Sequence, residues 1–218
     1  MAGDWVVWQI ADSAFPSGGF AHSGGLEAAW QHGVVTDAAA LAKWLGASMH
    51  QLHRGVLGFV QRSRQAPGQF IEIDSACDLF LNNHVANRAS RAQGRSFLAA
   101  SGGAFASPAV VQRAQEVREQ RTPGHFAVVF GLVCHELEIA PAQTSGLFGF
   151  VLLRSQISVA VRLGIIGPLE GQRLQADLSR EFESIVNRPV DPEPVQISPI
   201  TDLIQGTQDR LYSRLFQS

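Results

Sequence analysis

The sequence has little charge, little lysine and little cysteine. Asp, Glu, Lys and Arg make up 17% of its 218 residues, and the formal net charge is −2. Such a weakly charged chain does not predict nucleic acid or an anionic membrane as a partner through bulk electrostatics. Lys43 is the single lysine, and the two cysteines are Cys77 and Cys134. Two cysteines in a chain of this length do not form a disulfide framework.

Long apolar runs and targeting signals are lacking as well. No apolar run reaches the roughly 18 residues that a membrane span needs. Residues 1–10 contain neither a basic segment nor the clean apolar core of a secretory signal. We therefore expect a cytoplasmic protein whose partners are neither membranes nor nucleic acids.

Helical periodicity, in contrast, is present almost everywhere. From the expected cap Thr36 onwards, apolar residues recur at steps of three and four, which predicts one amphipathic helix of about six or seven turns. Its apolar face comprises Leu41, Trp44, Leu45, Met49, Leu52, Val56, Phe59 and Val60. Further helices are predicted near 70–81, 84–100, 108–120, 125–137, 142–163 and 168–186. No long linker divides this part, so we predict an all-α, single-domain helical bundle over residues 1–186.

The segment GLFGFVLLRSQISVAVRLG, residues 146–164, is apolar nearly all round, which predicts a helix at the centre of the bundle. Its polar residues fall within about 100° of one another on a helical wheel. They are Arg154, Ser155, Ser158 and Arg162. Because a buried unpaired guanidinium costs several kcal/mol, this stripe is expected to reach water, a carboxylate or a partner.

The character of the chain changes after Asn187. Four prolines in RPVDPEPVQISPI predict an extended arm rather than a helix. The chain then ends in LYSRLFQS, which is unusually apolar for a terminal segment. We expect residues 187–218 to be a proline-rich arm and a docking tail. The tail docks either on its own core or on another protein, and the second is the favoured interpretation.

The stretch DSAFPSGGFAHSGGLE, residues 12–27, is rich in glycine and serine. Glycine-rich turns bind phosphate when a strand precedes them, a helix follows and a lysine completes the charge. This stretch enters a helix near Leu26, but it has no preceding strand and no lysine. Phosphate binding is therefore the weakest of its interpretations.

Metal binding and catalysis are also weakly supported. His50 and His53 lie one turn apart, but His50 points away from the apolar face, and His22 stands alone in its loop. Cys134 and Glu138 share a face in CHELE, yet a buried structural cysteine is the commoner case. The sequence has neither a complete set of zinc ligands nor a G-x-S-x-G motif. No catalytic residue is predicted.

A basic stripe is more informative. His84, Arg88, Arg91 and Arg95 fall within about 60° of one another on one helix. Two interpretations remain open: a contact site for another protein, or ion pairs with carboxylates of the preceding segment. Those carboxylates would be Glu72, Asp74 and Asp78.

Five segments in order resemble the urease accessory protein UreF family. They are WQIADSAFPSGGFAHSGGLE, NRASRAQGRSFL, PGHFAVVFGLV, RSQISVAVRLGIIGPLEGQRL and LYSRLFQS, spread over most of the chain. The resemblance implies an all-α homodimer without catalytic activity or cofactor. It further implies a protein that bridges UreD, also called UreH, and the GTPase UreG, modulates GTP hydrolysis and delivers nickel to apo-urease.

The resemblance also implies partner-binding residues at the positions that match its motifs. These are His22, Ser23, Glu27, Arg88, Arg91, Gln93, Arg95, Ser213, Arg214, Leu215 and Phe216. Any contact of His22 with nickel would be transient. One departure is that Gln208 and Asp209 stand where many relatives carry a His-Glu pair, which weakens the case for metal handling there. The alternatives are a metal-dependent hydrolase using His22, His50 or His53, and a helical adaptor for a different GTPase.

Overall fold

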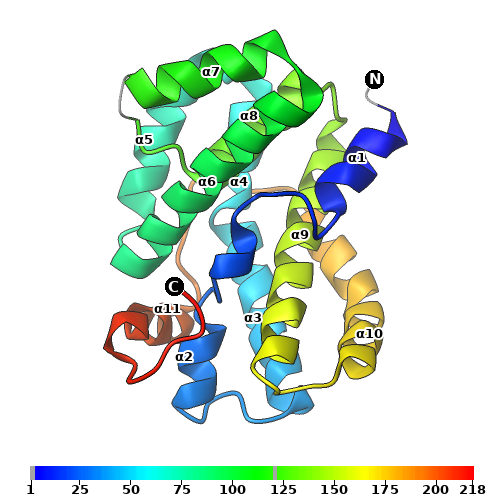
Figure 1. The fold of residues 1–218 in the computed structure, drawn as a ribbon, viewed down its shortest axis with the longest axis vertical. Helices are drawn as coiled ribbons and strands as arrows, with labels where there is room; N and C mark the ends of the chain where they lie inside the picture. The colour runs from blue at the N-terminus through cyan, green and yellow to red at the C-terminus, as the bar shows by residue number, and fades with distance from the viewer. Residues whose placement is uncertain (1–2, 120–121) are drawn as a thin grey trace.

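A computed structural model describes residues 3–119 and 122–218, and in this part of the chain all regular structure is helical (Figure 1). The α-helices are α1 (Asp4–Ala11), α2 (Leu26–Gln31), α3 (Ala38–Arg54), α4 (Leu57–Gln65), α5 (Phe70–Phe80), α6 (His84–Phe105), α7 (Pro108–Glu119), α8 (Phe126–Glu136), α9 (Pro141–Arg162), α10 (Pro168–Val186) and α11 (Pro199–Gly206). Short 3-10 turns are η1 (Gly19–Ala21), η2 (Pro67–Gln69) and η3 (Gln208–Arg210). The prediction of an all-α helical bundle is confirmed. The helix predicted near 108–120 was expected to end at Gln120, which lies outside the described residues.

The long helix predicted from Thr36 is in fact two helices. Asp37 is the N-cap of α3, and its Oδ1 accepts a hydrogen bond of 2.8 Å from the Ala40 amide. Gly55 ends α3 with φ −108° and ψ −94°, outside the helical region. The apolar pattern continues across this break because α3 and α4 both face the same core. Periodicity alone therefore could not locate the break.

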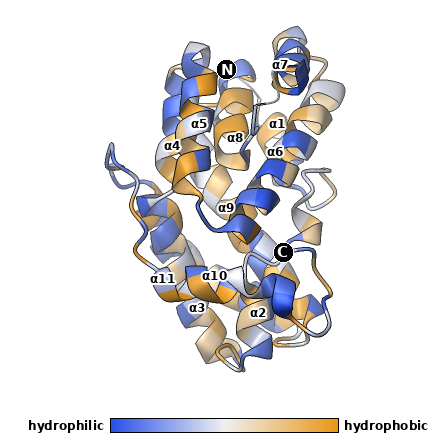
Figure 2. Cartoon of the chain, turned by 90° about the vertical axis from the view of Figure 1, so that its left-hand side faces the viewer, coloured by the Kyte–Doolittle hydropathy of each residue, from blue (hydrophilic) through white to orange (hydrophobic). Residues whose placement is uncertain are grey.

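The centre of the bundle is α8 rather than the predicted α9. Every residue from Phe126 to Cys134 is buried, and α8 packs between α4 and α6 (Figure 2). Two glycines allow this close packing. A Cβ at Gly131 would lie 2.1 Å from the carbonyl oxygen of Val60, and one at Gly94 would lie 2.0 Å from that of Gly124. The backbones therefore touch where α8 crosses its neighbours.

The N-terminus of α8 depends on a buried carboxylate. Asp74 on α5 is fully buried, and its two oxygens accept hydrogen bonds from the amides of Gly124, at 2.7 Å, and His125, at 2.8 Å. The first N–H groups of a helix lack partners within the helix, and a carboxylate stabilises that end. Asp74 thus fixes where α8 begins.

The second apolar helix, α9, packs against α3 and α10. Its segment Pro141–Arg162 is long and apolar enough to cross a membrane by length and composition, although 56% of the relevant window is buried inside the protein. A buried core helix can have the same length and apolar composition as a membrane span. Its contacts with α3 and α10 account for its apolar composition.

The proline-rich arm runs along α3 and ends sooner than expected. Val195 donates its amide to the Arg54 carbonyl, and Gln51 Oε1 accepts from the amides of Ile197, at 2.6 Å, and Ser198, at 3.0 Å. Pro199 then begins α11, a helix that the proline content did not predict. Proline is well tolerated at the first helical position, where its missing N–H has no intrahelical partner.

The Gly131 contact leads to a stability prediction. Replacing Gly131 by Ala forces α8 away from α4, and we expect the free energy of unfolding to fall by about 2 kcal/mol or more. Gly146→Ala on α9 is the matched control, because a Cβ there meets no atom within 4 Å. Relief of glycine's backbone entropy should leave that variant unchanged or more stable by about 0.5–1 kcal/mol. Denaturant unfolding measures both, and equal stability of the two variants would contradict the packing argument.

Candidate functional site

The glycine-rich stretch forms a loop that closely approaches two other helices. Gly24 and Gly25 have positive φ angles of 60° and 87°, which favour glycine. A Cβ on Gly25 would lie 2.9 Å from the Cβ of Gln205 on α11. On the other side, Gln156 of α9 donates its Nε2 hydrogen to the Ser23 carbonyl at 2.8 Å. This part of the loop therefore packs against α9 and α11.

Immediately after this loop, Glu27 on α2 is buried, with 1% of its surface exposed. Its carboxylate accepts three hydrogen bonds, all from the C-terminal tail. The Leu215 amide donates to Oε1 at 2.6 Å, while Gln208 Nε2 and the Phe216 amide donate to Oε2 at 2.6 and 3.2 Å. Hydrogen bonds to a charged group are the stronger kind, and such a group is costly to leave unpaired when buried. Glu27 thus holds the tail on α2.

Further hydrogen bonds continue this docking along the tail. Gln217 donates its amide to the Ala21 carbonyl at 2.8 Å, and His22 Nδ1 and the Ser218 hydroxyl share a hydrogen bond of 2.5 Å. Gln31 Nε2 donates to the Ser213 carbonyl at 2.8 Å. Residues 207–218 docked on residues 19–32 are called the tail platform below. Figure 1 shows it where the red end of the chain meets the blue α2.

Stacked side chains hold the same region from α9. The guanidinium carbon of Arg162 lies 3.8 Å from the ring centroid of Phe20 and 4.1 Å from that of Phe216. Its Nη1 also donates to the Phe20 carbonyl at 2.6 Å. A guanidinium between two aromatic faces is a favourable cation–π arrangement. One end of the predicted polar stripe on α9 is therefore bound to the tail platform.

Two members of the basic stripe of α6, His84 and Arg88, pair with the tail. Arg88 makes a bidentate contact with Asp209 at 3.0 and 2.8 Å, and Arg214 reaches the same carboxylate at 3.1 Å. His84 lies 3.4 Å from it. The hydrogen bonds with Arg88 are the first cause that lowers the pKa of Asp209 below its ordinary value. The interpretation as ion pairs with Glu72, Asp74 and Asp78 is thus wrong for Arg88.

The expected carboxylate partners on α5 have other roles. Asp74 caps α8, as described above, and Asp78 accepts hydrogen bonds from Asn87 at 2.8 Å and from His125 at 3.0 Å. The departure at Gln208 and Asp209 is also accounted for. Gln208 is a buried donor to Glu27, and Asp209 is the shared acceptor for Arg88 and Arg214.

The expected partner-binding residues differ in how far they are buried. Four of them are buried inside the tail platform: His22, Ser23, Glu27 and Phe216. The exposed members of the set are Arg88, Arg95, Ser213, Arg214 and Leu215. Arg91 and Gln93 are half-buried. With the tail docked, only the exposed members of the set lie on the surface of the protein.

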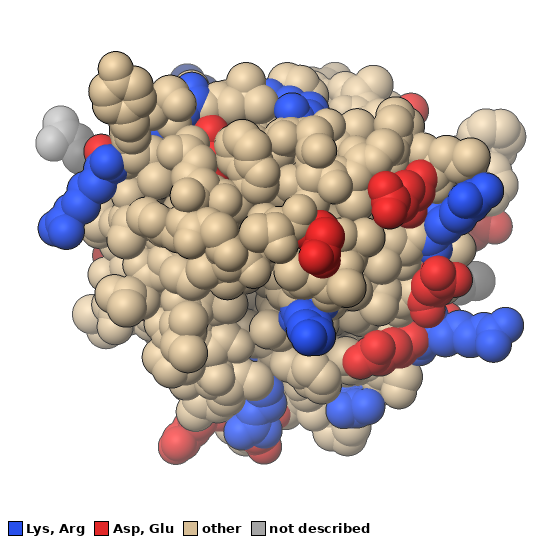
Figure 3. Space-filling model, turned by 90° about the horizontal axis from the view of Figure 1, so that it is seen from below, with Lys and Arg blue, Asp and Glu red and all other residues tan. Residues whose placement is uncertain are grey.

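Some exposed apolar residues of α11 and the tail were not predicted from the sequence as partner-binding residues. Ile200 and Leu203 on α11 are 71% and 72% exposed, and Tyr212 of the tail is fully exposed. The available signal was the three-residue step after Pro199, which marks one face of a helix. Figure 3 shows the end of the molecule that carries α2, where uncharged residues cover most of the surface.

The residues considered for metal binding do not form a site in the described part of the chain. No group of three or more His, Cys, Asp and Glu side chains that could hold a metal occurs within residues 3–119 and 122–218. His50 is exposed, whereas His53 is buried and lies 3.4 Å from the Arg188 carbonyl. Burial raises the pKa of the Cys134 thiol to about 12, which disfavours the thiolate needed for metal binding or nucleophilic attack. The hydrolase alternative is left without a ligand group there.

The hydrogen bonds of Glu27 lead to a prediction about the tail. In Glu27→Gln, an amide nitrogen replaces an acceptor oxygen and the charge is lost, so at least one tail N–H loses its partner. Since hydrogen bonds to charged groups contribute about 1.5–3 kcal/mol, hydrogen-exchange protection of the Leu215 and Phe216 amides should fall at least about tenfold. Glu72→Gln, an exposed change on α5, should leave that protection unchanged. Unaltered protection in Glu27→Gln would contradict the assigned role.

A pH dependence follows from His22. Burial, and secondly the positive charge of Arg88, lower the pKa of His22 below its ordinary value of 6.5. Around and below that value the unfolded chain binds more protons than the folded one, so stability should fall as the pH drops through about 6.5. Burial lowers the pKa of His125 in the same direction. We therefore expect His22→Gln to reduce the slope of unfolding free energy against pH without abolishing it. The exposed His50→Gln should keep the full slope, and equal slopes for both variants would exclude this role of His22.

The central part of the chain matches a known protein family. The family model described as UreF matches residues 35–179, which is 145 of the 218 residues. This match runs from the start of α3 into α10 and does not include the tail platform.

Similar proteins extend over nearly the whole chain. Urease accessory protein F of Oryza sativa subsp. indica is 32% identical over 222 residues, covering 97% of this chain and 84% of the relative. Urease accessory protein F of Arabidopsis thaliana is 31% identical, covering 98% of this chain and 92% of the relative. Urease accessory protein UreF of Bacillus sp. (strain TB-90) is 27% identical, covering 97% of each. These names describe accessory proteins and not catalysts. The chain belongs to the UreF family of urease accessory proteins.

Proposed function

We propose that this chain is the adaptor of a nickel-insertion complex in the cytoplasm, linking UreD to the GTPase UreG and delivering nickel to apo-urease. The observation that carries the proposal is the tail platform. A terminal segment normally extends into solvent, whereas here the buried carboxylate of Glu27 accepts from two of its backbone amides and from the Gln208 side chain. A tail fixed in this way is pre-organised for binding, because little conformational entropy remains to be lost.

The exposed side chains of this region suit a protein partner. Leu203, Tyr212 and Leu215 are exposed by 72%, 104% and 54%, respectively, and Arg214, between Tyr212 and Leu215 in the sequence, places its guanidinium on Asp209. Exposed apolar groups with a neighbouring arginine are typical of protein interfaces, and tyrosine and arginine are frequent among energetically dominant residues. Nothing in this arrangement requires a metal ligand or a nucleophile.

In the proposed mechanism the adaptor gates the GTPase. The complex with UreD would favour a UreG state that is competent for GTP hydrolysis when apo-urease is present, so that hydrolysis is coupled to nickel delivery. A coupling free energy of about 1–3 kcal/mol suffices for such gating. The chain acts as a homodimer in this proposal, as the family resemblance implies.

Co-purification with UreD and UreG tests the proposal. We expect the intact chain to recover a ternary complex, and the double change Tyr212→Ala with Leu215→Ala to weaken it by about 2 kcal/mol or more, roughly 30-fold. Arg214→Ala should weaken it as well, because the arginine itself is expected to contact the partner. The tail should stay docked in that variant, since Arg88 still holds Asp209. The exposed Arg180→Ala on α10 is the matched control and should leave recovery unchanged.

Two results would contradict the proposal. Failure of the intact chain to form a complex with UreD and UreG, together with capture of another GTPase, would favour the alternative adaptor role. If the complex forms but GTP turnover by UreG is the same with and without this chain and UreD, the gating mechanism is wrong.

A further inference from the structure

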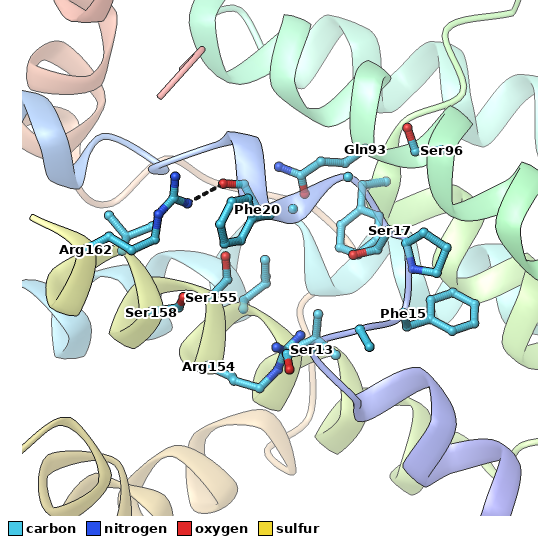
Figure 4. Close-up of a pocket in the computed structure, with 18 residues that line it drawn as sticks. Ser13, Phe15, Ser17, Phe20, Gln93, Ser96, Arg154, Ser155, Ser158 and Arg162 are labelled. Atoms are coloured by element: carbon cyan, nitrogen blue, oxygen red, sulfur yellow. Dashed lines mark hydrogen bonds between the residues drawn. The ribbon is translucent and has the colours of Figure 1, made fainter. Parts of the chain in front are cut away.

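A cavity with both polar and apolar walls lies beside the tail platform, between the glycine-rich loop and the helices α6 and α9. Its volume is about 640 Å³, within the usual range for small-molecule sites. Residues 13–20 of the loop and residues of α9 line the cavity (Figure 4). None of the described residues that line it is an aspartate or glutamate, whereas two are arginines, Arg154 and Arg162. The cavity is therefore lined by positive charge without a matching carboxylate.

The two arginines differ in what they bind. Arg162 donates one hydrogen bond to the Phe20 carbonyl and lies over the rings of Phe20 and Phe216. Arg154, in contrast, has a buried Nε without a hydrogen-bond partner. An unpaired buried donor is costly, and the cost is greater for a charged group. Figure 4 shows the Arg154 side chain extending from α9 beside Ser13 of the loop.

The electrostatics of Arg154 agree with this geometry. Burial lowers the pKa of its guanidinium below the ordinary value, and the charge of Asp12, outside the cavity lining, opposes that effect. An anion in the cavity would pair with the positive charge of Arg154 through the accessible part of its guanidinium and would offset the cost of its burial. Hydroxyl groups that can add hydrogen bonds line the same space: Ser13, Ser17, Ser155 and Ser158.

The cavity also has an apolar wall. Phe126 of α8 contributes to it together with Val151, Leu152 and Val159 of α9. An inorganic ion would leave this wall uncovered, whereas an organic acid could pair its charged group with Arg154 and place its carbon chain against the wall. Each buried CH₂ adds about 0.8 kcal/mol to such binding.

We propose that this cavity is a binding site for a small organic anion, whose carboxylate or phosphate group pairs with Arg154 while its apolar body packs against Phe126, Val151 and Leu152. The site does not depend on the adaptor function proposed above, and neither proposal falls with the other. It lies next to the tail platform, to which Phe20 and Arg162 connect it.

Isothermal titration of the full chain with matched probes tests this assignment. Hexanoate and hexyl phosphate are expected to bind in the millimolar range or tighter, with the stronger of the two identifying the preferred acid group. Acetate and inorganic phosphate should bind at least about tenfold more weakly, because they leave the apolar wall uncovered. Hexylamine, with the opposite charge, should not bind. Equal heats for hexanoate and hexylamine, or no binding of either acid up to about 10 mM, would overturn the proposal.

Variants separate this cavity from unspecific binding. Arg154→Met keeps much of the side-chain volume and should lower hexanoate affinity at least tenfold, whereas Arg154→Lys should retain part of it. Arg180→Met, an exposed change on α10, is the control and should bind as the intact protein does. If Arg154→Met does not fold, Ser158→Ala provides the test, with an expected loss of a few-fold. Unchanged affinity in a folded Arg154→Met, or in Ser158→Ala in its place, would exclude the cavity as the site.

Discussion

The arrangement of the candidate site depends on one buried carboxylate, that of Glu27. A buried negative charge requires donors, and this one takes all three from residues 208–216, about 180 positions further along the chain. The requirement ties the two ends of the chain together and turns an apolar tail into a defined surface. Gly25 makes it possible, because a side chain there would separate the loop from α11. The glycine-rich stretch thus shapes protein surface rather than a nucleotide site.

The helical core beneath this site also contains a buried carboxylate that requires hydrogen-bond donors, that of Asp74. Asp74 is fully buried and accepts hydrogen bonds from the amides of Gly124 and His125, directly before the helix that forms the centre of the bundle. Gly94 and Gly131 then let the neighbouring backbones touch that helix. Close packing of this kind resists deformation, so the surface elements α2, α11 and the tail rest on a rigid core.

This architecture suits a protein that works by holding other proteins. Membership of the UreF family describes an accessory role. Arg162 connects the proposed anion cavity to the tail platform, since its guanidinium lies between Phe20 and Phe216. An occupied cavity and a docked tail therefore share one arginine and one loop, which offers a physical route by which a small ligand could influence partner binding.

Local patterns in the sequence determined the fold class and most helices, because helical periodicity depends on neighbours a few residues apart. They also marked residues 12–27, the basic stripe of α6 and the apolar tail as the informative segments. They did not reveal the break at Gly55, the central place of α8, the helix after Pro199 or the burial of His22, Glu27 and Phe216. The central place of α8 and the burial of His22, Glu27 and Phe216 depend on contacts between residues far apart in the chain. Whether Arg88 pairs with Asp78 or with Asp209 is decided by which carboxylate the packed helices bring within reach, and local spacing carries no information about that distance.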